Sequence, residues 1–285
     1  MGSTDAPAAA TRLAAPSAGE LAMLGELVTA SHWNQVAADW DLFLSQGSVH
    51  VIRDAQGRII ASGAVLPMGN AAPGVAWISM ILVLPQVRGA GLGKAVFGAC
   101  LREIRAMGRI PMLDATPAGE ALYTQFGFEP SWRSTRWRRP APDGKTLAPA
   151  VPGEAQRLLQ WDAEALGFAR AEVLGALARR AGSACHANAG AVALVRAGRV
   201  AHQLGPLLAQ DGAAAARLLE AVSASVAAPL VADVPDERPA MDEALRRLGF
   251  KEERRFARMA LLAPGQRAPT GRQAWMHAIA GPEFA

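Results

Sequence analysis

Three glycines at alternate positions, Gly89, Gly91 and Gly93, follow an apolar run and lie between two basic residues, Arg88 and Lys94. Because glycine has no side chain, such a loop turns tightly and leaves its backbone N–H groups uncovered. At the start of a helix these groups have no partner within the helix, and the helix dipole attracts negative charge. Glycine also serves ordinary turns and helix starts, but this combination predicts a site for a pyrophosphate.

The spacing alone leaves a dinucleotide site open. A dinucleotide-binding loop is followed about 20 residues later by an acidic side chain, and Asp114 lies 21 residues after Gly93. Against this interpretation, the glycines are spaced G-x-G-x-G instead of G-x-G-x-x-G. The loop also lies in the middle of its domain, behind two predicted helices and a hairpin.

The loop and a downstream tyrosine resemble the GNAT superfamily of acetyltransferases. In that family a strand ending in valine is followed by Arg/Gln-x-x-Gly-x-Gly/Ala, and residues 83–91, V-L-P-Q-V-R-G-A-G, match this pattern. The family then carries a tyrosine four residues before a Gly-Phe pair, and Tyr123 precedes Gly127 and Phe128 at that spacing. The match covers residues 11–139 and, more loosely, the second half of the chain.

The resemblance implies an N-acetyltransferase that moves an acetyl group directly from acetyl-CoA to an amine of a small molecule or peptide. The pantetheine arm would lie between the strands at 75–84 and 110–115, which splay apart in this family. Tyr123 would return a proton to the CoA thiolate, for which a phenol with an ordinary pKa of about 10 is suited; a half-buried core aromatic is the alternative. The residues expected to bind the cofactor are Leu82, Val83, Arg88, Gly89, Ala90, Gly91, Leu92, Gly93, Lys94 and Thr116.

Two positions depart from the family pattern. Many members have an asparagine seven residues before the tyrosine, where this chain has Thr116, whose hydroxyl replaces only one of the amide's contacts. Members also often carry a glutamate base on the strand before the loop, but residues 77–83 read W-I-S-M-I-L-V. The general base therefore stays open between a water relay and Asp114, the nearest carboxylate in sequence, which would serve equally well as a turn or cap residue.

The acceptor pocket of this superfamily is lined by the first two helices and their connection. Trp33 and Trp40 would form an apolar wall there, and Asp39 or His32 would meet a cationic amine. The alternative is that the tryptophans belong to the core and the polar residues cap helices. The residues expected to bind the substrate are His32, Trp33, Asn34 and Asp39.

The second half of the chain repeats the order of the first, which indicates an internal duplication. Gly127 and Gly249 each precede a phenylalanine and lie 122 residues apart, as do Arg136 and Arg258. At this offset Asp211 replaces Gly89 and Leu245 replaces Tyr123, so we predict a degenerate copy that does not catalyse. Its acidic residues would either recognise a basic substrate or be solvated loop charges; they are Asp233, Asp236 and Glu237.

The order of the expected strands and helices predicts an α/β fold, an α+β arrangement with a mixed sheet, in two tandem GNAT-like domains. A single long α/β domain is the alternative. We predict a flexible tail at 1–10, a catalytic domain at 11–139, a linker at 140–153, a degenerate domain at 154–265 and a C-terminal extension at 266–285. In the first half, strands are expected at 11–15, 49–53, 58–66, 75–84, 110–115 and 128–138, and helices around 21–28, 36–44, 92–107 and 119–126. In the second, helices are expected within 154–180, at 213–226 and up to 248, and strands at 191–196, 199–208, 230–234 and from 250.

Composition narrows the class of protein. With 285 residues, 51% hydrophobic and 19% charged, the chain is typical of a folded protein, and no apolar stretch is long enough to span a membrane, so we expect a cytoplasmic protein. Cys100 and Cys185 lie far apart, which argues against a disulfide framework or a metal site. The basic run at 133–139 alternates with apolar residues, so we expect an edge strand with one solvated face and no nucleic-acid partner. The net charge of +4 suits a phosphate-bearing ligand.

Two other functions stay open at this stage. The missing glutamate base and Thr116 would suit a non-catalytic acyl-CoA-binding sensor. A tandem GNAT protein could also transfer an aminoacyl or other acyl group to a larger acceptor. The sequence does not determine which amine is the acceptor or whether the protein forms a homodimer.

Overall fold

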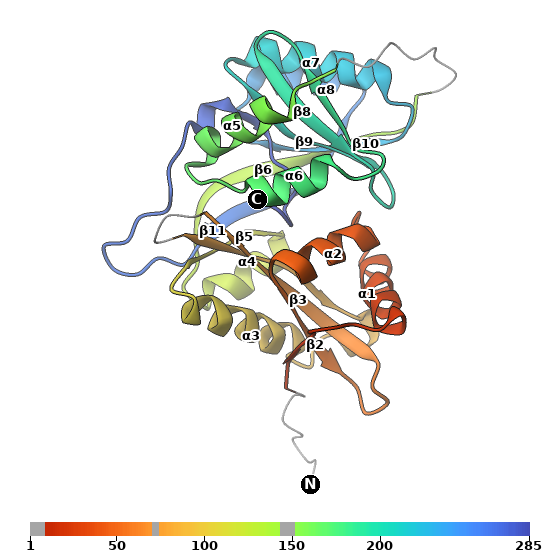
Figure 1. The fold of residues 1–285 in the computed structure, drawn as a ribbon, viewed down its shortest axis with the longest axis vertical. Coiled ribbons are helices and arrows are strands. Elements are labelled where there is room, and N and C mark those ends of the chain that lie inside the picture. The colour runs from red at the N-terminus through yellow and green to blue at the C-terminus, as the bar shows by residue number, and fades with distance from the viewer. Residues whose placement is uncertain (1–8, 70–73, 143–151) are drawn as a thin grey trace.

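A computed structural model describes residues 9–69, 74–142 and 152–285. The predicted tail and linker lie mostly outside these ranges. Figure 1 shows the two halves stacked on each other, the first in red to yellow and the second in green to blue, with the C-terminus near the middle of the molecule. In the described residues, no helix is long and apolar enough to cross a membrane.

The first half carries the strands and helices that the periodicity predicts, with ends shifted by a few residues. The strands are β1 (Thr11–Arg12), β2 (Ser48–Arg53), β3 (Ile59–Met68), β4 (Val75–Val83), β5 (Ile110–Ala115) and β6 (Glu129–Arg139). The helices are α1 (Ala18–Ala30), α2 (Ala37–Gln46), α3 (Leu92–Ala106) and α4 (Pro117–Thr124), with a 3-10 turn, η1, at Pro85–Val87.

The second half repeats this order. Its strands are β7 (Ala184–Ala187), β8 (Ala191–Arg196), β9 (His202–Ala209), β10 (Leu230–Pro235), β11 (Lys251–Ala260) and β12 (Met276–Ala278). Its helices are α5 (Ala155–Leu166), α6 (Ala171–Ala178), α7 (Gly212–Ser225) and α8 (Pro239–Arg247), with a 3-10 turn, η2, at Gln273–Trp275. The mixed α/β fold in two tandem halves is confirmed. The sequence did not indicate β7 or β12.

All strands belong to one sheet, in the order β1-β2-β3-β4-β5-β11-β6-β10-β9-β8-β7, with β12 on β9. The closing strands are exchanged between the halves: β11 pairs with β5 of the first half, and β6 pairs with β10 of the second. The expectation that residues 133–139 form an edge strand is therefore wrong. Only part of the run is solvated: Arg133 is exposed, whereas Arg136 and Arg139 are buried and find partners in the second half.

The hydrophobic core is continuous across the two halves. One cluster of buried side chains runs from α1, α2 and the sheet of the first half to α5 and α6 of the second. The C-terminal segment joins it, since the ring of Phe284 stacks on that of Phe43 with centroids 5.4 Å apart. The halves therefore form one packed body, and residues from both can meet at a site between them.

Candidate active site

Strands β4 and β5 separate partway along their length. They pair in parallel only from Val75 with Ile110 to Trp77 with Met112, although both strands continue beyond that point. On its other side β4 bulges against β3, where the register shifts between Ser62 and Ala64, and the buried residue Met80 has a φ of 54°. A bulge bends a strand and increases its twist. The predicted splay is confirmed, and it leaves a gap in the sheet.

A cavity of about 70 Å³ opens in this gap. Residues from β4, from the end of β5 and from α4 form one side. Residues from the second half form the other, among them Arg254, Phe256 and Glu283. The second copy thus supplies part of the wall of a site whose strands belong to the first.

Tyr123 reaches this cavity from α4 and is buried to 9% exposure. Its ring packs on Phe97, with centroids 4.6 Å apart, and a Cβ on Gly119 would come within 2.9 Å of the ring. Burial raises the pKa of the Tyr123 phenol, because the charged phenolate would lose its hydration. Tyr123 therefore packs on the core, as the alternative interpretation expects, and it also lines the cavity.

The glycine loop lies at the end of β4 and opens α3. Gly89 and Gly91 have φ values of 86° and 76°, which a side chain would strain, and no atom lies within 4 Å of where their Cβ would be. Gly91 is the N-cap of α3, and no described side chain caps this helix. Its first backbone N–H groups are therefore open to an anion.

The remaining residues expected at the cofactor surround this loop. Arg88 and Lys94 are exposed, and Arg88 Nε donates to the carbonyl of Val83 at 3.1 Å. Leu82 and Val83 lie beyond the splay, where β4 no longer pairs with β5 but still pairs with Ser62 and Ala61 of β3. Thr116 caps α4, where its hydroxyl accepts from the N–H of Gly119 at 3.3 Å, and it lines the cavity beside Tyr123. The structure thus brings this set together along one gap.

Asp114 lies in the cavity wall, but both of its oxygens are occupied. Arg258 Nε and Nη2 donate to Oδ1 and Oδ2 at 3.0 and 2.8 Å, and both side chains are almost fully buried. Burial raises the pKa of Asp114, and the charge of Arg258 opposes this shift. A carboxylate held on both oxygens is a poor acceptor for a third proton donor, so we do not assign the base to Asp114.

Of the four residues expected at the substrate, only Trp33 lines the cavity. Asn34 instead binds the backbone of the second half, accepting from the N–H groups of Val200 and Ala201. Asp39 accepts from Arg180 at 2.5 Å and from the N–H of Val36, and is buried. His32 is exposed. Asn34 and Asp39 thus hold a helix and the two halves in place, which is the alternative that the sequence left open, and Trp40 is a core residue.

Three polar residues of the cavity were missed by the sequence analysis. Gln35 Oε1 and Ser79 Oγ are buried without a hydrogen-bond partner among the described residues. Glu283 is buried, and its Oε1 accepts from Arg196 at 2.5 Å. Its segment is fixed by Trp77, whose indole N–H donates to the carbonyl of Pro282 at 2.9 Å. The sequence carries no signal that residues so far apart would meet.

The corresponding gap in the second half is closed. Strands β9 and β10 pair only as far as Leu204 with Ala232 and then separate, but β12 pairs with β9 beyond this point and Ile279 N–H donates to the carbonyl of Asp233. A Cβ on Gly205 would lie 1.9 Å from the carbonyl oxygen of Ile279, so glycine permits this close approach.

The N-terminus of α7, the helix that follows β9, is also occupied. Asp211 is the N-cap of α7, and its carboxylate accepts from the N–H of Ala214 at 2.7 Å. In the second half, Asp211 and β12 therefore occupy the helix start and the gap between strands that stay open in the first half. This geometry agrees with the predicted loss of function in the second copy.

Comparisons with known proteins agree with this architecture in both halves. Residues 22–128 match a model described as the acetyltransferase (GNAT) family, and residues 158–273 match one described as an acetyltransferase (GNAT) domain. No curated protein matches the chain in sequence.

Among solved structures, one described as an acetyltransferase from Pyrococcus horikoshii is 19% identical, with a TM-score of 0.77 over 100% of this chain and 99% of that one. A GCN5-related N-acetyltransferase from Sphaerobacter thermophilus is 17% identical, with a TM-score of 0.60 over 92% and 96%. A tandem GNAT protein from the clavulanic acid biosynthesis pathway is 16% identical, with a TM-score of 0.60 over 88% and 97%. At sequence identities this low, the similarity to these structures shows a shared fold.

Proposed function

The chain belongs to the GNAT acetyltransferases and carries two GNAT domains in tandem, and from this premise we propose that its first half transfers an acetyl group from acetyl-CoA to an amine. The observation that supports this most is the alignment of two features along one gap. A buried phenol lies at the cavity, and a helix start without a side-chain cap, preceded by two glycines at positive φ, lies at the end of β4.

The residues of the first half fit the proposed co-substrate. The open N–H groups of α3, with Arg88 and Lys94 beside them, would hold the diphosphate. Beyond the point where β4 stops pairing with β5, the β4 backbone at Leu82 and Val83 would lie along the pantetheine arm in the gap between the two strands. The thioester would then lie beside Tyr123.

The proposed reaction is a direct transfer. The amine nitrogen attacks the thioester carbonyl carbon, the new C–N bond forms and the C–S bond breaks. The amine loses one proton to a base, and the Tyr123 hydroxyl gives one proton to the departing thiolate. The raised pKa of the phenol keeps that proton in place until the thiolate forms.

Glu283 is our candidate for the group that receives the amine's proton, directly or through water. It is the second carboxylate of the cavity, and unlike Asp114 it is bound through only one oxygen among the described residues. Gln35 Oε1 and Ser79 Oγ add acceptors that an ammonium group could satisfy. The cavity is small, at about 70 Å³, so it suits the amine end of an acceptor.

Substitution of Tyr123 tests the function. We expect Tyr123→Phe to lower kcat by about 100-fold, because general acid catalysis contributes at least that much, while the Kd for acetyl-CoA changes by less than about twofold. Turnover with a panel of primary amines and calorimetry on the same samples measure both. Equal losses in kcat and affinity would contradict the role of Tyr123. Binding of acetyl-CoA without transfer to any amine would support the sensor instead.

A further inference from the structure

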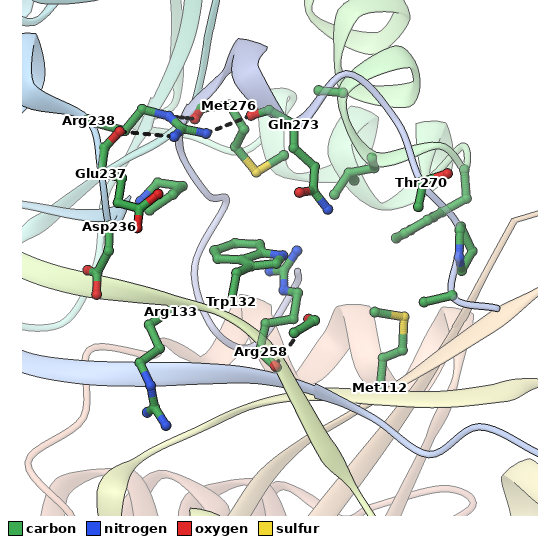
Figure 2. A pocket seen from close by; sticks show the side chains of 17 residues that line it. Met112, Trp132, Arg133, Asp236, Glu237, Arg238, Arg258, Thr270, Gln273 and Met276 are labelled. Atoms are coloured by element: carbon green, nitrogen blue, oxygen red, sulfur yellow. Dashed lines mark hydrogen bonds between the residues drawn. The ribbon is translucent and has the colours of Figure 1, made fainter.

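A second and larger cavity, of about 500 Å³, lies between the halves further along the exchanged strands β6 and β11, at Trp132 and Arg258. Figure 2 shows the ring of Trp132 at its centre, with the carboxylates of Asp236 and Glu237 to one side and Thr270 to the other. Met112 and Met276 add apolar wall. This volume is in the range of sites that hold small metabolites.

The position of this second cavity follows from an internal twofold relation. In the β6–β11 pair Trp132 faces Arg258, and Arg136 faces Arg254. Adding or subtracting the repeat of 122 residues exchanges these two pairs, so a twofold axis passes between the strands. Arg136 lines the reactive cavity and Arg258 lines the second one. The second cavity is therefore the counterpart of the reactive cavity in the degenerate half.

A ligand in the second cavity would not react. The gap between β9 and β10 is filled by β12, the start of α7 is capped by Asp211, and Leu245 stands where the first half has Tyr123. What the degenerate half keeps is the space on the acceptor side. The cavity can thus bind a molecule without transferring anything to it.

The charges in the wall select the ligand. Arg258 is paired with Asp114, and Arg133 is paired with Glu120 at 2.6 Å. Within the described ranges, Arg238 donates only to backbone carbonyls, those of Met276, Gln273 and Glu237.

The two carboxylates of the wall lack such partners. Asp236 accepts from the hydroxyl of Thr135 at 2.9 Å, and neither Asp236 nor Glu237 has an ion-pair partner among the described residues. Two carboxylates then stand against one arginine without a countercharge, Arg238, and this leaves an excess of one negative charge. Arg258 covers the Trp132 ring at 4.2 Å on one side, and the ring also borders the cavity.

We propose that this cavity is a binding site for a small organic amine in its ammonium form, stacked on Trp132 and neutralised by Asp236 and Glu237. An ammonium group gains both from the carboxylates and from the face of an indole. The site does not depend on acetyl-CoA, because its residues lie outside the gap between β4 and β5. Its occupant stays unmodified.

Benzylamine is a suitable probe, because benzyl alcohol and benzoate match its shape without its positive charge. We expect calorimetry without acetyl-CoA at pH 7 to show that benzyl alcohol and benzoate bind at least tenfold more weakly than benzylamine. Asp236→Asn with Glu237→Gln should weaken benzylamine at least tenfold, since both changes keep an acceptor oxygen and remove only charge. Glu220→Gln with Glu243→Gln, which removes two exposed carboxylates that line neither cavity, is the matched control and should leave this binding unchanged.

A crystal soaked with benzylamine locates the probe, and we expect it against Trp132. Equal affinity for benzoate, unchanged affinity in the double variant, or density only in the reactive cavity would each overturn the proposal. Equal unfolding midpoints of the double variant and the parent protein would show that the fold is intact. Because no transfer is measured, failure here leaves the acetyltransferase proposal standing, and absence of acetyl transfer by the parent protein would leave this one standing.

Discussion

Tyr123 packs on the core and also lines the cavity, and its burial affects the pH at which the phenol loses its proton. The side chain is buried against Phe97 and Gly119, and burial raises its pKa above the ordinary value. For an acid, a raised pKa means that the proton is kept to higher pH. The phenol is therefore protonated at every pH at which a thiolate would need its proton.

This predicts the alkaline side of the pH profile. Deprotonation of Tyr123 should cause no fall in kcat between pH 7 and about 10, since an unperturbed tyrosine titrates only near about 10. Any fall in that range should persist in Tyr123→Phe, because another group would cause it. Profiles of kcat for both proteins check this. A fall below pH 9 that disappears in Tyr123→Phe would contradict it.

Residue types and spacing predicted one side of the site better than the other. The glycine loop, Tyr123 and Thr116 lie along one gap because each follows a strand whose period is readable in the sequence. Asn34 and Asp39 were expected at the substrate, but both accept hydrogen bonds from residues of the second half instead. Glu283 was missed because its place depends on tertiary contacts of Trp77 and Arg196, which no local pattern reveals.

At the scale of elements, the three-residue strand β12 determines what the second half can do. It lies where β9 and β10 separate, the place that stays open between β4 and β5 in the first half. The strand is too short to give a period of its own. The sequence therefore indicated only an extension at 266–285, whereas the α3 and β5 patterns gave those elements within one residue.

Gly205 allows β12 and its continuation to lie in this gap. In Gly205→Ala the new Cβ would meet the carbonyl oxygen of Ile279 at 1.9 Å, so the C-terminal segment must shift. We expect a loss of about 1–3 kcal/mol in the free energy of unfolding, the size typical of overpacking in a core. Gly25→Ala is the matched control: Gly25 lies inside α1 with nothing within 4 Å, and alanine there should stabilise by about 0.5–1 kcal/mol. Urea unfolding measures both, and equal effects would contradict this role of Gly205.

At the scale of the whole molecule, the exchange of β6 and β11 ties the halves together. Arg136 of the first half binds Asp233 of the second at 2.7 and 2.8 Å, and Arg258 of the second binds Asp114 of the first in the same way. Both pairs are buried. The duplication was readable from repeated spacings, but an exchange of strands leaves those spacings unchanged, so the sequence could not predict it.

The buried pairs predict how the molecule unfolds. Asp233→Asn leaves the guanidinium of Arg136 buried without its countercharge, which should cost about 3–5 kcal/mol. Because β6 and β11 belong to both halves, circular dichroism and tryptophan fluorescence should report one transition, in the variant as in the parent protein. Glu253→Gln, which breaks the half-exposed pair with Arg138, should cost at most about 1 kcal/mol. Two separate transitions would contradict a single body.

The central claim is that the start of α3 binds a diphosphate and that the start of α7 does not. Calorimetric titration of CoA into the protein tests it most directly, and we predict one molecule bound per chain. Gly91→Asp places at the N-cap of α3 the carboxylate that α7 carries at Asp211, and it should weaken CoA at least tenfold, while Asp211→Gly should leave the affinity unchanged. No uptake of CoA, or equal uptake by Gly91→Asp and the parent protein, would contradict the account.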